Sequence, residues 1–123
     1  MSKINLNGWL FLDKPIGMTS NKALQKIRKI FRNCKAGFVG TLDPLASGTL
    51  PIALGTATKL IRYIENVNKT YIFTINWGFK TETGDSEGEI IGKKEVFPEE
   101  KDIEKKLLDF TGKILQKTPK FSS

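Results

Sequence analysis

The sequence contains no histidine. This absence excludes Ser-His nucleophiles, histidine-ligated metal sites and histidine general bases. Any chemistry that the chain performs must therefore come from carboxylates, lysines, tyrosines or hydroxyl groups.

Cysteine and long apolar runs are scarce as well. Cys34 is the single cysteine, so an internal disulfide and a cysteine-rich zinc site are ruled out. Near the N-terminus, only Trp9 to Leu12 form an apolar run, and Asp13 interrupts it. That run is too short for a signal peptide or a membrane span. The lack of a secretion signal and of a disulfide indicates a cytoplasmic protein.

Acidic residues are rare in one half of the chain. Residues 1–62 contain ten Lys or Arg and only two acids, Asp13 and Asp43, whereas residues 63–123 contain ten Lys and eleven acids. The first half therefore carries +8 and the second −1, which adds up to the net charge of +7. A basic half predicts a face for a polyanion. Nucleic acid fits better than an anionic membrane surface, and a merely basic small protein is the plain alternative.

At 123 residues the chain amounts to one domain at most. Hydrophobic patterning predicts strands and helices that alternate along it. The N-terminal half is expected to contain a strand over 8–12, a helix from an N-cap among Thr19, Ser20 and Asn21 to about 32, a loop over 37–48, a strand over 49–54 and a short helix over 56–65.

The C-terminal half begins with an alternating segment, 70–79, in which Tyr71, Phe73, Ile75 and Trp77 would share one face of a strand. A turn-rich connection over 81–88, a strand over about 89–96 and a helix opened by Pro98 and running to about 110 follow, with irregular chain after 111. The order predicts an α+β fold with the helices packed on one side of the sheet.

The acid Asp43 stands out within Gly37 to Lys59, GFVGTLDPLASGTLPIALGTATK. Pro44 restricts the backbone of the residue before it, and Gly40 and Gly48 permit a close approach of another backbone or a ligand. A helix N-cap followed by proline would also explain Asp43. Local physics alone favours the cap over a catalytic role.

Three blocks of the sequence change that balance. GWLFLDKPIGMTS, GFVGTLDPLASGTLPIALGTATK and NKTYIFTINWGFKTETGDSEGE follow one another in the order and at the spacing of the bacterial tRNA pseudouridine synthase B family, which the chain resembles from Asn7 to Ser123. The GTLDPLASG core carries most of the specificity. The resemblance implies the N-terminal half of the mixed-sheet catalytic fold of the pseudouridine synthases.

The resemblance also implies an activity. Members of the family convert a uridine of the tRNA T loop to pseudouridine by breaking the glycosidic bond, rotating the uracil and rejoining it through carbon. They use neither a metal nor a cofactor, and no membrane is involved. Asp43 matches the catalytic aspartate, which would attack the base or the sugar, or abstract a sugar proton, in a nucleotide flipped out of its stack.

Other site residues carry over by position. Tyr71 matches a tyrosine that packs on the target base, although a core tyrosine in a strand is the structural alternative. Lys14 in LDKP would support the site or contact a phosphate, or else form a surface ion pair. Asp85 matches an acid near the RNA or the catalytic loop, but a turn-forming aspartate explains it equally well.

The chain departs from the family pattern in two ways. Phe38 stands where the family commonly has a histidine that contacts the T loop, and a phenylalanine can stack but cannot donate a hydrogen bond. The family is also about twice as long. Residues 1–123 are therefore expected to form part of the catalytic domain, without the catalytic-site arginine, the rest of that domain or the C-terminal RNA-binding domain.

Missing strands would leave sheet edges and an apolar face open, and a second chain that completes the fold is one possible partner besides tRNA. Two alternatives to an enzyme stay open at this point. One is a non-catalytic RNA-binding module, and the other is an inactive remnant of such an enzyme.

Overall fold

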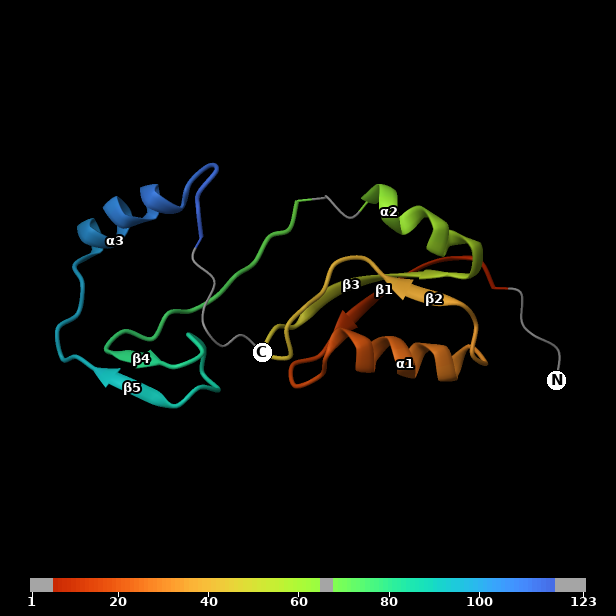
Figure 1. Cartoon of the computed structure of the whole chain (residues 1–123), viewed down its shortest axis with the longest axis horizontal. Helices are drawn as coiled ribbons and strands as arrows, with labels where there is room; N and C mark the ends of the chain where they lie inside the picture. The colour runs from red at the N-terminus through yellow and green to blue at the C-terminus, as the bar shows by residue number, and fades with distance from the viewer. Residues whose placement is uncertain (1–5, 65–67, 117–123) are drawn as a thin grey trace. The chain divides into compact units, whose positions relative to one another are not determined.

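The computed structural model describes residues 6–64 and 68–116. The chain divides into two compact units, Met1–Thr70 and Tyr71–Ser123, and each is described by itself (Figure 1). Within the described residues, none of the helices is long and apolar enough to cross a membrane.

A three-stranded antiparallel sheet forms the centre of the first unit. Its order is β1 (Gly8–Lys14), β3 (Gly48–Leu54), β2 (Ala36–Phe38). The strands predicted over 8–12 and 49–54 are confirmed and run slightly further. The loop predicted over 37–48 is wrong at its start, because Gly37 and Phe38 pair with β3. A strand of three residues is too short to show a period in the sequence.

The central strand contains Pro51, which cannot donate to a ladder. Its carbonyl accepts a hydrogen bond from the N–H of Val39 at 2.9 Å, on the side of β2. The N–H that Pro51 lacks would point to the same side, one residue beyond the last β2 pair, Phe38 with Ile52. The proline therefore costs the β1–β3 ladder no hydrogen bond.

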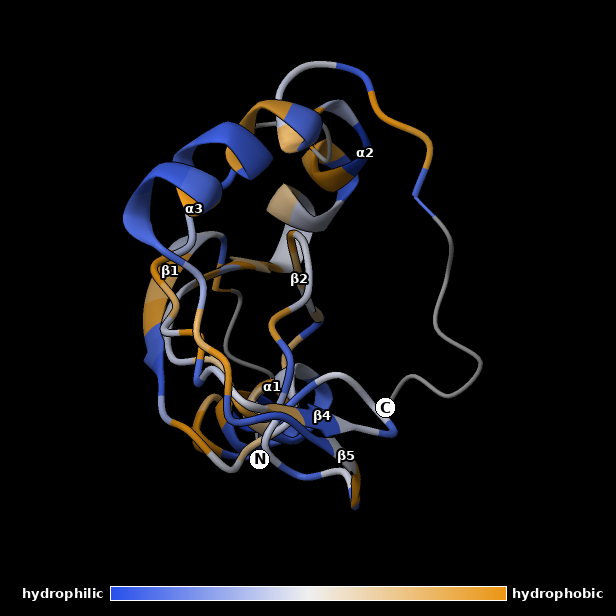
Figure 2. Ribbon diagram, turned by 90° about the vertical axis from the view of Figure 1, so that its left-hand side faces the viewer, coloured by the Kyte–Doolittle hydropathy of each residue, from blue (hydrophilic) through white to orange (hydrophobic). Residues whose placement is uncertain are grey.

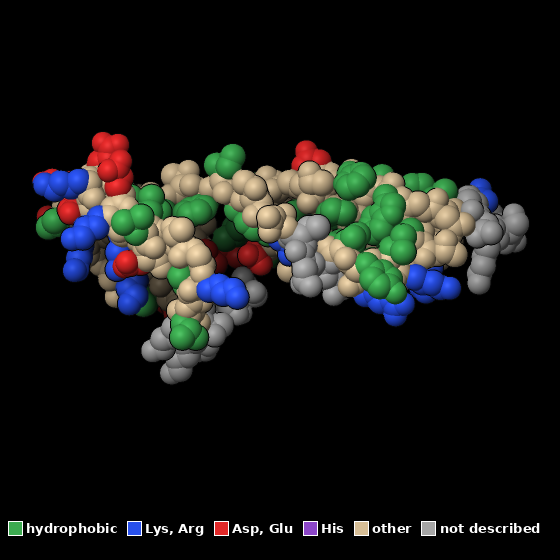
Figure 3. Space-filling model, turned by 90° about the horizontal axis from the view of Figure 1, so that it is seen from above, with side chains coloured by type: hydrophobic (Ala, Val, Ile, Leu, Met, Phe, Trp, Pro, Cys, Tyr) green, Lys and Arg blue, Asp and Glu red, His purple; other side chains and the backbone are tan. Residues whose placement is uncertain are grey.

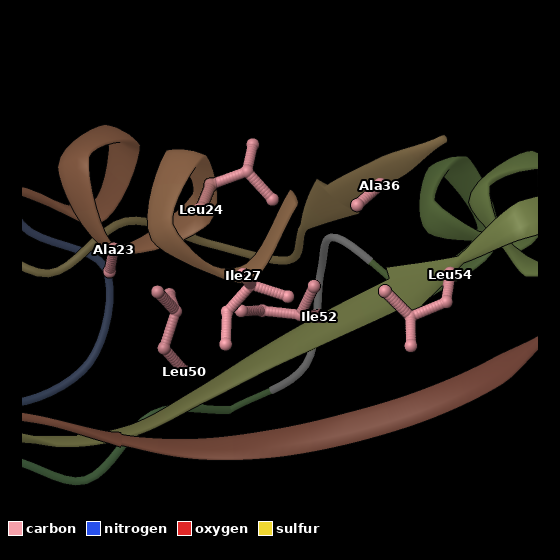
Figure 4. Packing of buried hydrophobic residues seen from close by; sticks show 7 residues of the cluster. All are labelled: Ala23, Leu24, Ile27, Ala36, Leu50, Ile52 and Leu54. Atoms are coloured by element: carbon pink, nitrogen blue, oxygen red, sulfur yellow. The ribbon is translucent and has the colours of Figure 1, made fainter. Parts of the chain in front are cut away.

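The helix α1 (Ser20–Ile30) covers one face of this sheet. Its N-cap is Thr19, one of the three predicted candidates. The Thr19 hydroxyl accepts a hydrogen bond from the N–H of Lys22 at 3.1 Å. It ends two residues before the predicted end, because Arg32 and Asn33 have positive φ angles of 50° and 58°. Figure 4 shows how Ile27 is directed toward Leu50 and Ile52 in the buried cluster, Ala23, Leu24, Ile27, Ala36, Leu50, Ile52 and Leu54.

A second helical segment lies over the opposite face. It consists of the 3-10 helix η1 (Gly55–Leu60) and the short helix α2 (Ile61–Ile64). A Cβ on Gly37 would lie 2.9 Å from Cδ1 of Ile61, and Gly37 pairs with Ala53, whose side chain points away from α1. The expectation of helices on one side of the sheet is therefore wrong. Hydrophobic side chains gather on the α2 side of this unit (Figure 3).

The helix predicted over 56–65 is confirmed as this segment, but Glu65 lies outside the described residues. Helical periodicity identified the segment correctly. It could not identify the covered face, which depends on pairing between strands that are distant in sequence.

The second unit contains a hairpin and a helix. Strands β4 (Phe79–Thr81) and β5 (Ile90–Lys93) pair antiparallel, and α3 (Glu100–Leu107) continues into η2 (Leu108–Phe110). The predicted strand over 89–96 is confirmed in shorter form. The predicted helix over 98–110 begins later than expected, because Glu99 and not Pro98 precedes its first turn. Residues 111–116 are irregular, as predicted, and 117–123 lie outside the described residues.

The strand predicted over 70–79 is contradicted, since only Phe79 belongs to a strand. Its aromatic side chains are exposed, and Ile72 is fully so. A strand needs the backbone of a partner, and none of the described strands pairs with 71–77. Within 71–116, every described residue is exposed or half-buried. The largely hydrophilic α3 in Figure 2 is consistent with this lack of a buried core.

Truncating the buried cluster should destabilise the first unit. We expect Ile52→Ala, at a fully buried site, to lower the free energy of unfolding by about 2–5 kcal/mol. Phe11→Ala is the matched control, because Phe11 lies on the same sheet with 69% of its surface exposed. Urea unfolding followed by circular dichroism measures both, and an equal effect of the two substitutions would contradict the assigned core.

Candidate active site

The candidate site lies on the loop between β2 and β3, residues 39–47. The sheet holds both ends of this loop, because the N–H of Val39 binds Pro51 and Gly48 pairs with Lys14 at the end of β1. The loop therefore leaves the sheet from β2 and re-enters it beside the segment that leads from β1 into α1.

Ser20, the first residue of α1, holds the loop one residue before Asp43. Its hydroxyl donates to the carbonyl of Leu42 at 3.0 Å and accepts from the N–H of Leu42 at 2.9 Å. Ser20 is 3% exposed, so this one side chain satisfies both backbone groups of Leu42 away from water. The contact joins residues 22 positions apart in the sequence.

A second contact fixes the loop one residue after Asp43. The N–H of Gly17 donates to the carbonyl of Pro44 at 2.7 Å. Together with the Ser20 contacts, this bond fastens the chain on both sides of Asp43 to the turn between β1 and α1. The backbone of Asp43 thus has little freedom, and only its side chain can rotate.

Lys14 supports that turn from inside. Its side chain is fully buried, and Nζ donates to the carbonyls of Met18 at 2.7 Å and Pro15 at 3.0 Å. A buried ammonium group is costly unless its donors are satisfied, so these carbonyls hold Lys14 in place while Lys14 holds the turn. The surface ion pair considered for Lys14 is therefore excluded, and the ammonium faces no solvent in which to meet a phosphate.

Asp43 itself is exposed. Its carbonyl accepts from the N–H of Ala46 at 3.0 Å, which closes a turn, but no helix begins at Pro44. In residues 6–64 and 68–116, its carboxylate has neither a hydrogen bond nor a salt bridge. The N-cap interpretation is therefore wrong: the carboxylate caps nothing and stays available to a bound molecule.

Lys69 is a residue of the site that the sequence reasoning missed. Gly40 has a φ of +68°, and a Cβ built on it would lie 2.9 Å from Cε and 3.0 Å from Nζ of Lys69. The Lys69 side chain thus lies against the loop three residues before Asp43. Its place in the NKTY block, two residues before Tyr71, was the only signal in the sequence.

Phe38 lies at the end of β2, opposite Ile52. It is half-buried and packs against the buried cluster under α1. Part of its ring is therefore committed to the core, and the remainder faces outward at the start of the loop. Its proposed stacking on RNA stays a prediction.

Tyr71 and Asp85 belong to the second unit. Tyr71 is 54% exposed, so its ring is accessible in this chain, and its role on the target base stays a prediction. Asp85 organises the β4–β5 turn: one carboxylate oxygen accepts from the hydroxyl of Thr83 at 2.6 Å and from the N–H groups of Glu87 at 2.9 Å and Gly88 at 3.3 Å. Its turn-forming role is thus observed. Its meeting with Asp43 and Tyr71 around one substrate stays a prediction.

Replacing the Ser20 hydroxyl should loosen the site loop. Ser20→Ala leaves the N–H and C=O of Leu42 unsatisfied, which costs about 1–3 kcal/mol, and should speed hydrogen exchange at the Leu42 amide. Ser47→Ala is the matched control, because Ser47 is exposed in the same loop. Urea unfolding and exchange by NMR measure the two effects, and unchanged exchange at Leu42 would contradict the assigned contact.

The β4–β5 turn should weaken in acid. The Thr83 hydroxyl, followed by the Glu87 N–H, holds the pKa of the Asp85 carboxyl below its usual 3.8. The stabilisation is therefore present above pH 3.8 and is lost as the pH falls through the lowered pKa. NMR titration of the carboxyl carbon measures this, and Thr83→Ala should move the pKa back toward 3.8. Ser86→Ala should leave it unchanged, and equal shifts in both variants would refute the assignment.

Comparison with known proteins assigns the chain to a family. Residues 28–123 match the model of the TruB family pseudouridylate synthase (N terminal domain). The chain is 52% identical over 118 residues to the tRNA pseudouridine synthase B of Wolbachia pipientis subsp. Culex pipiens, and 53% identical over 120 residues to that of Wigglesworthia glossinidia brevipalpis. These alignments cover 96% and 97% of this chain but 33% and 37% of the relatives.

Among solved structures, the chain is similar to one chain of an H/ACA RNP bound to a substrate RNA containing 2'-deoxyuridine. The identity is 47%, the TM-score is 0.45, and the match covers 46% of this chain and 18% of the other. With respect to the two curated relatives above, the chain spans about a third of their length.

Proposed function

Because this chain belongs to the TruB family of pseudouridylate synthases, we propose that it supplies the catalytic carboxylate for converting a T-loop uridine of tRNA to pseudouridine. The main support for this proposal is that the Asp43 side chain is exposed on a backbone that hydrogen bonds from Ser20 and Gly17 fix on either side. A group that acts in a transition state must be positioned before the substrate arrives.

The reaction is an isomerisation. The bond between N1 of uracil and C1′ of the ribose breaks, a bond between C5 and C1′ forms, and the proton on C5 is lost while N1 gains one. No electrons are gained or lost overall, and the only groups required are those that activate the base or the sugar. Asp43 would do so as a nucleophile toward either, or as a base toward a sugar proton.

The substrate nucleotide must leave its stack to reach Asp43, because the reacting atoms of a stacked uridine are covered by its neighbours. Tyr71 would stack on the extruded uracil, and Phe38 would stack on the T loop of the RNA. Lys69 lies against the protein loop that carries Asp43 and would attract the flanking phosphate. Asp85 acts indirectly, by shaping the β4–β5 turn near the RNA.

The +8 charge of residues 1–62 favours tRNA as the partner. The open apolar surface of the second unit, where Ile72 and Leu115 are fully exposed, fits completion of the fold by further polypeptide. A tRNA substrate, which the names of the relatives suggest, is consistent with the cytoplasm as the compartment.

The decisive experiment removes the carboxylate and keeps its shape. In Asp43→Asn, release of tritium from C5-labelled uridine in an unmodified T-arm stem-loop should fall by on the order of 10³-fold or more, while RNA binding is retained. Asp13→Asn is the matched control, because Asp13 is exposed and is the other acid among residues 1–62. Measurable turnover that is equal in Asp43→Asn and in the unchanged chain would contradict the proposal.

The non-catalytic alternative is tested in parallel. The chain is joined to the remaining C-terminal part of the Wolbachia relative, and the same two substitutions are assayed in that chimera. Turnover that depends on Asp43 in the chimera supports the proposal even where the 123 residues alone only bind RNA. Binding without turnover in both forms would identify an RNA-binding module, and the absence of a cooperative melt would identify a remnant.

A further inference from the structure

The exposed face of α1 carries positive charge. Lys22, Lys26 and Lys29 are all exposed, and their spacing of four and three residues places them on one side of the helix. We refer to these three residues as the lysine face. The residues buried under the helix, Ala23, Leu24 and Ile27, lie on the other side, so packing on the sheet leaves the lysine face open to solvent.

Nothing in the local sequence neutralises this charge. The 29 residues between Asp13 and Asp43 contain no acid. Within residues 6–64 and 68–116, the two salt bridges are Lys101–Glu99 and Lys106–Asp109, both in the second unit. A solvated helix face usually mixes both signs of charge. A helix without acids, with three lysines on one line, is built to meet an anion that comes from outside the unit.

The lysine face is long enough for several charges of a polyanion. Lys22 and Lys29 are seven residues apart, which is about 10 Å along the helix. One nucleic-acid strand advances about 3.4 Å per phosphate along its axis. The three ammonium groups can therefore meet about three successive phosphates.

The lysine face also begins beside the candidate active site. Lys22 follows two residues after Ser20, whose hydroxyl holds Leu42 next to Asp43. An RNA with a nucleotide at Asp43 would thus have neighbouring backbone within reach of the first turn of α1. An anionic membrane fits less well, because an interfacial helix inserts its apolar face, and that face of α1 is already buried against β3.

We propose that the lysine face of α1 binds the phosphate backbone of the RNA whose target nucleotide reaches Asp43. This inference rests on the proposed function for the identity of the RNA. The contact is with phosphates alone, so it adds affinity and register without reading bases.

The test is the salt dependence of RNA binding by the full chain. The triple variant Lys22→Gln, Lys26→Gln, Lys29→Gln should bind a T-arm stem-loop more weakly at low salt, and the slope of log K against log[salt] should become about 2 to 3 less negative. Fluorescence anisotropy measures both values. The matched control is the triple variant Lys94→Gln, Lys105→Gln, Lys113→Gln. These lysines are exposed, and their substitution removes the same charge from the second unit.

The outcomes separate this inference from the proposed function. A triple Lys→Arg variant should restore the slope, and the Gln variant should melt like the unchanged chain, because the substitutions lie away from the core. Asp43→Asn should lose turnover and keep the salt slope of the unchanged chain, so a failure of the proposed function and a failure of this inference give different results. The inference is overturned by an equal slope in the Gln and control variants, by no RNA binding at low salt, or by loss of binding to anionic phospholipid vesicles without a change in the RNA slope.

Discussion

The hydroxyl of Ser20 is the contact on which the candidate site depends. It satisfies both backbone groups of Leu42 in a buried position, and so ties the start of α1 to the loop that carries Asp43. Hydrogen bonds to buried backbone groups matter because an unmade one is costly. With the Gly17–Pro44 bond on the other side, the contact converts an irregular loop into a fixed platform for one exposed carboxylate.

The two sides of α1 have different roles around this loop. One side of α1 packs on β3 and fixes the helix, and thereby Ser20. The other side presents three lysines to solvent. Lys14, at the end of β1, has a structural role instead. Its buried ammonium group binds the carbonyls of Pro15 and Met18 and shapes the turn that leads into α1. In this basic segment, Lys14 stabilises the fold, whereas the lysine face of α1 remains open to an anionic partner.

The sequence predicted what depends on local pattern. The strands predicted over 8–12 and 49–54 and the helix after one of three candidate caps, of which Thr19 is the one observed, follow from hydrophobic period and capping chemistry. The site loop was singled out because Asp43 stands between glycines and before a proline. The same local reasoning also favoured an N-cap at Asp43, which the structure contradicts.

What the sequence could not predict depends on contacts between distant residues. The Ser20–Leu42 contact, the burial of Lys14 and the position of Lys69 against Gly40 each require knowledge of which segments meet. The segment at 71–77 shows the converse error. Its residues alternate as those of a strand do. A strand also needs the backbone of a neighbouring strand to pair with, and none of the described strands pairs with this segment.

Catalysis by Asp43 requires that its side chain meets the reacting nucleotide. The most direct measurement is a crystal structure of the Asp43→Asn chain with an unmodified T-arm stem-loop. We expect an extruded uridine with its base or its C1′ about 3–3.5 Å from the side chain of residue 43, and an unchanged 39–47 loop. A uridine that stays stacked in the RNA, or that binds away from residue 43, would contradict it.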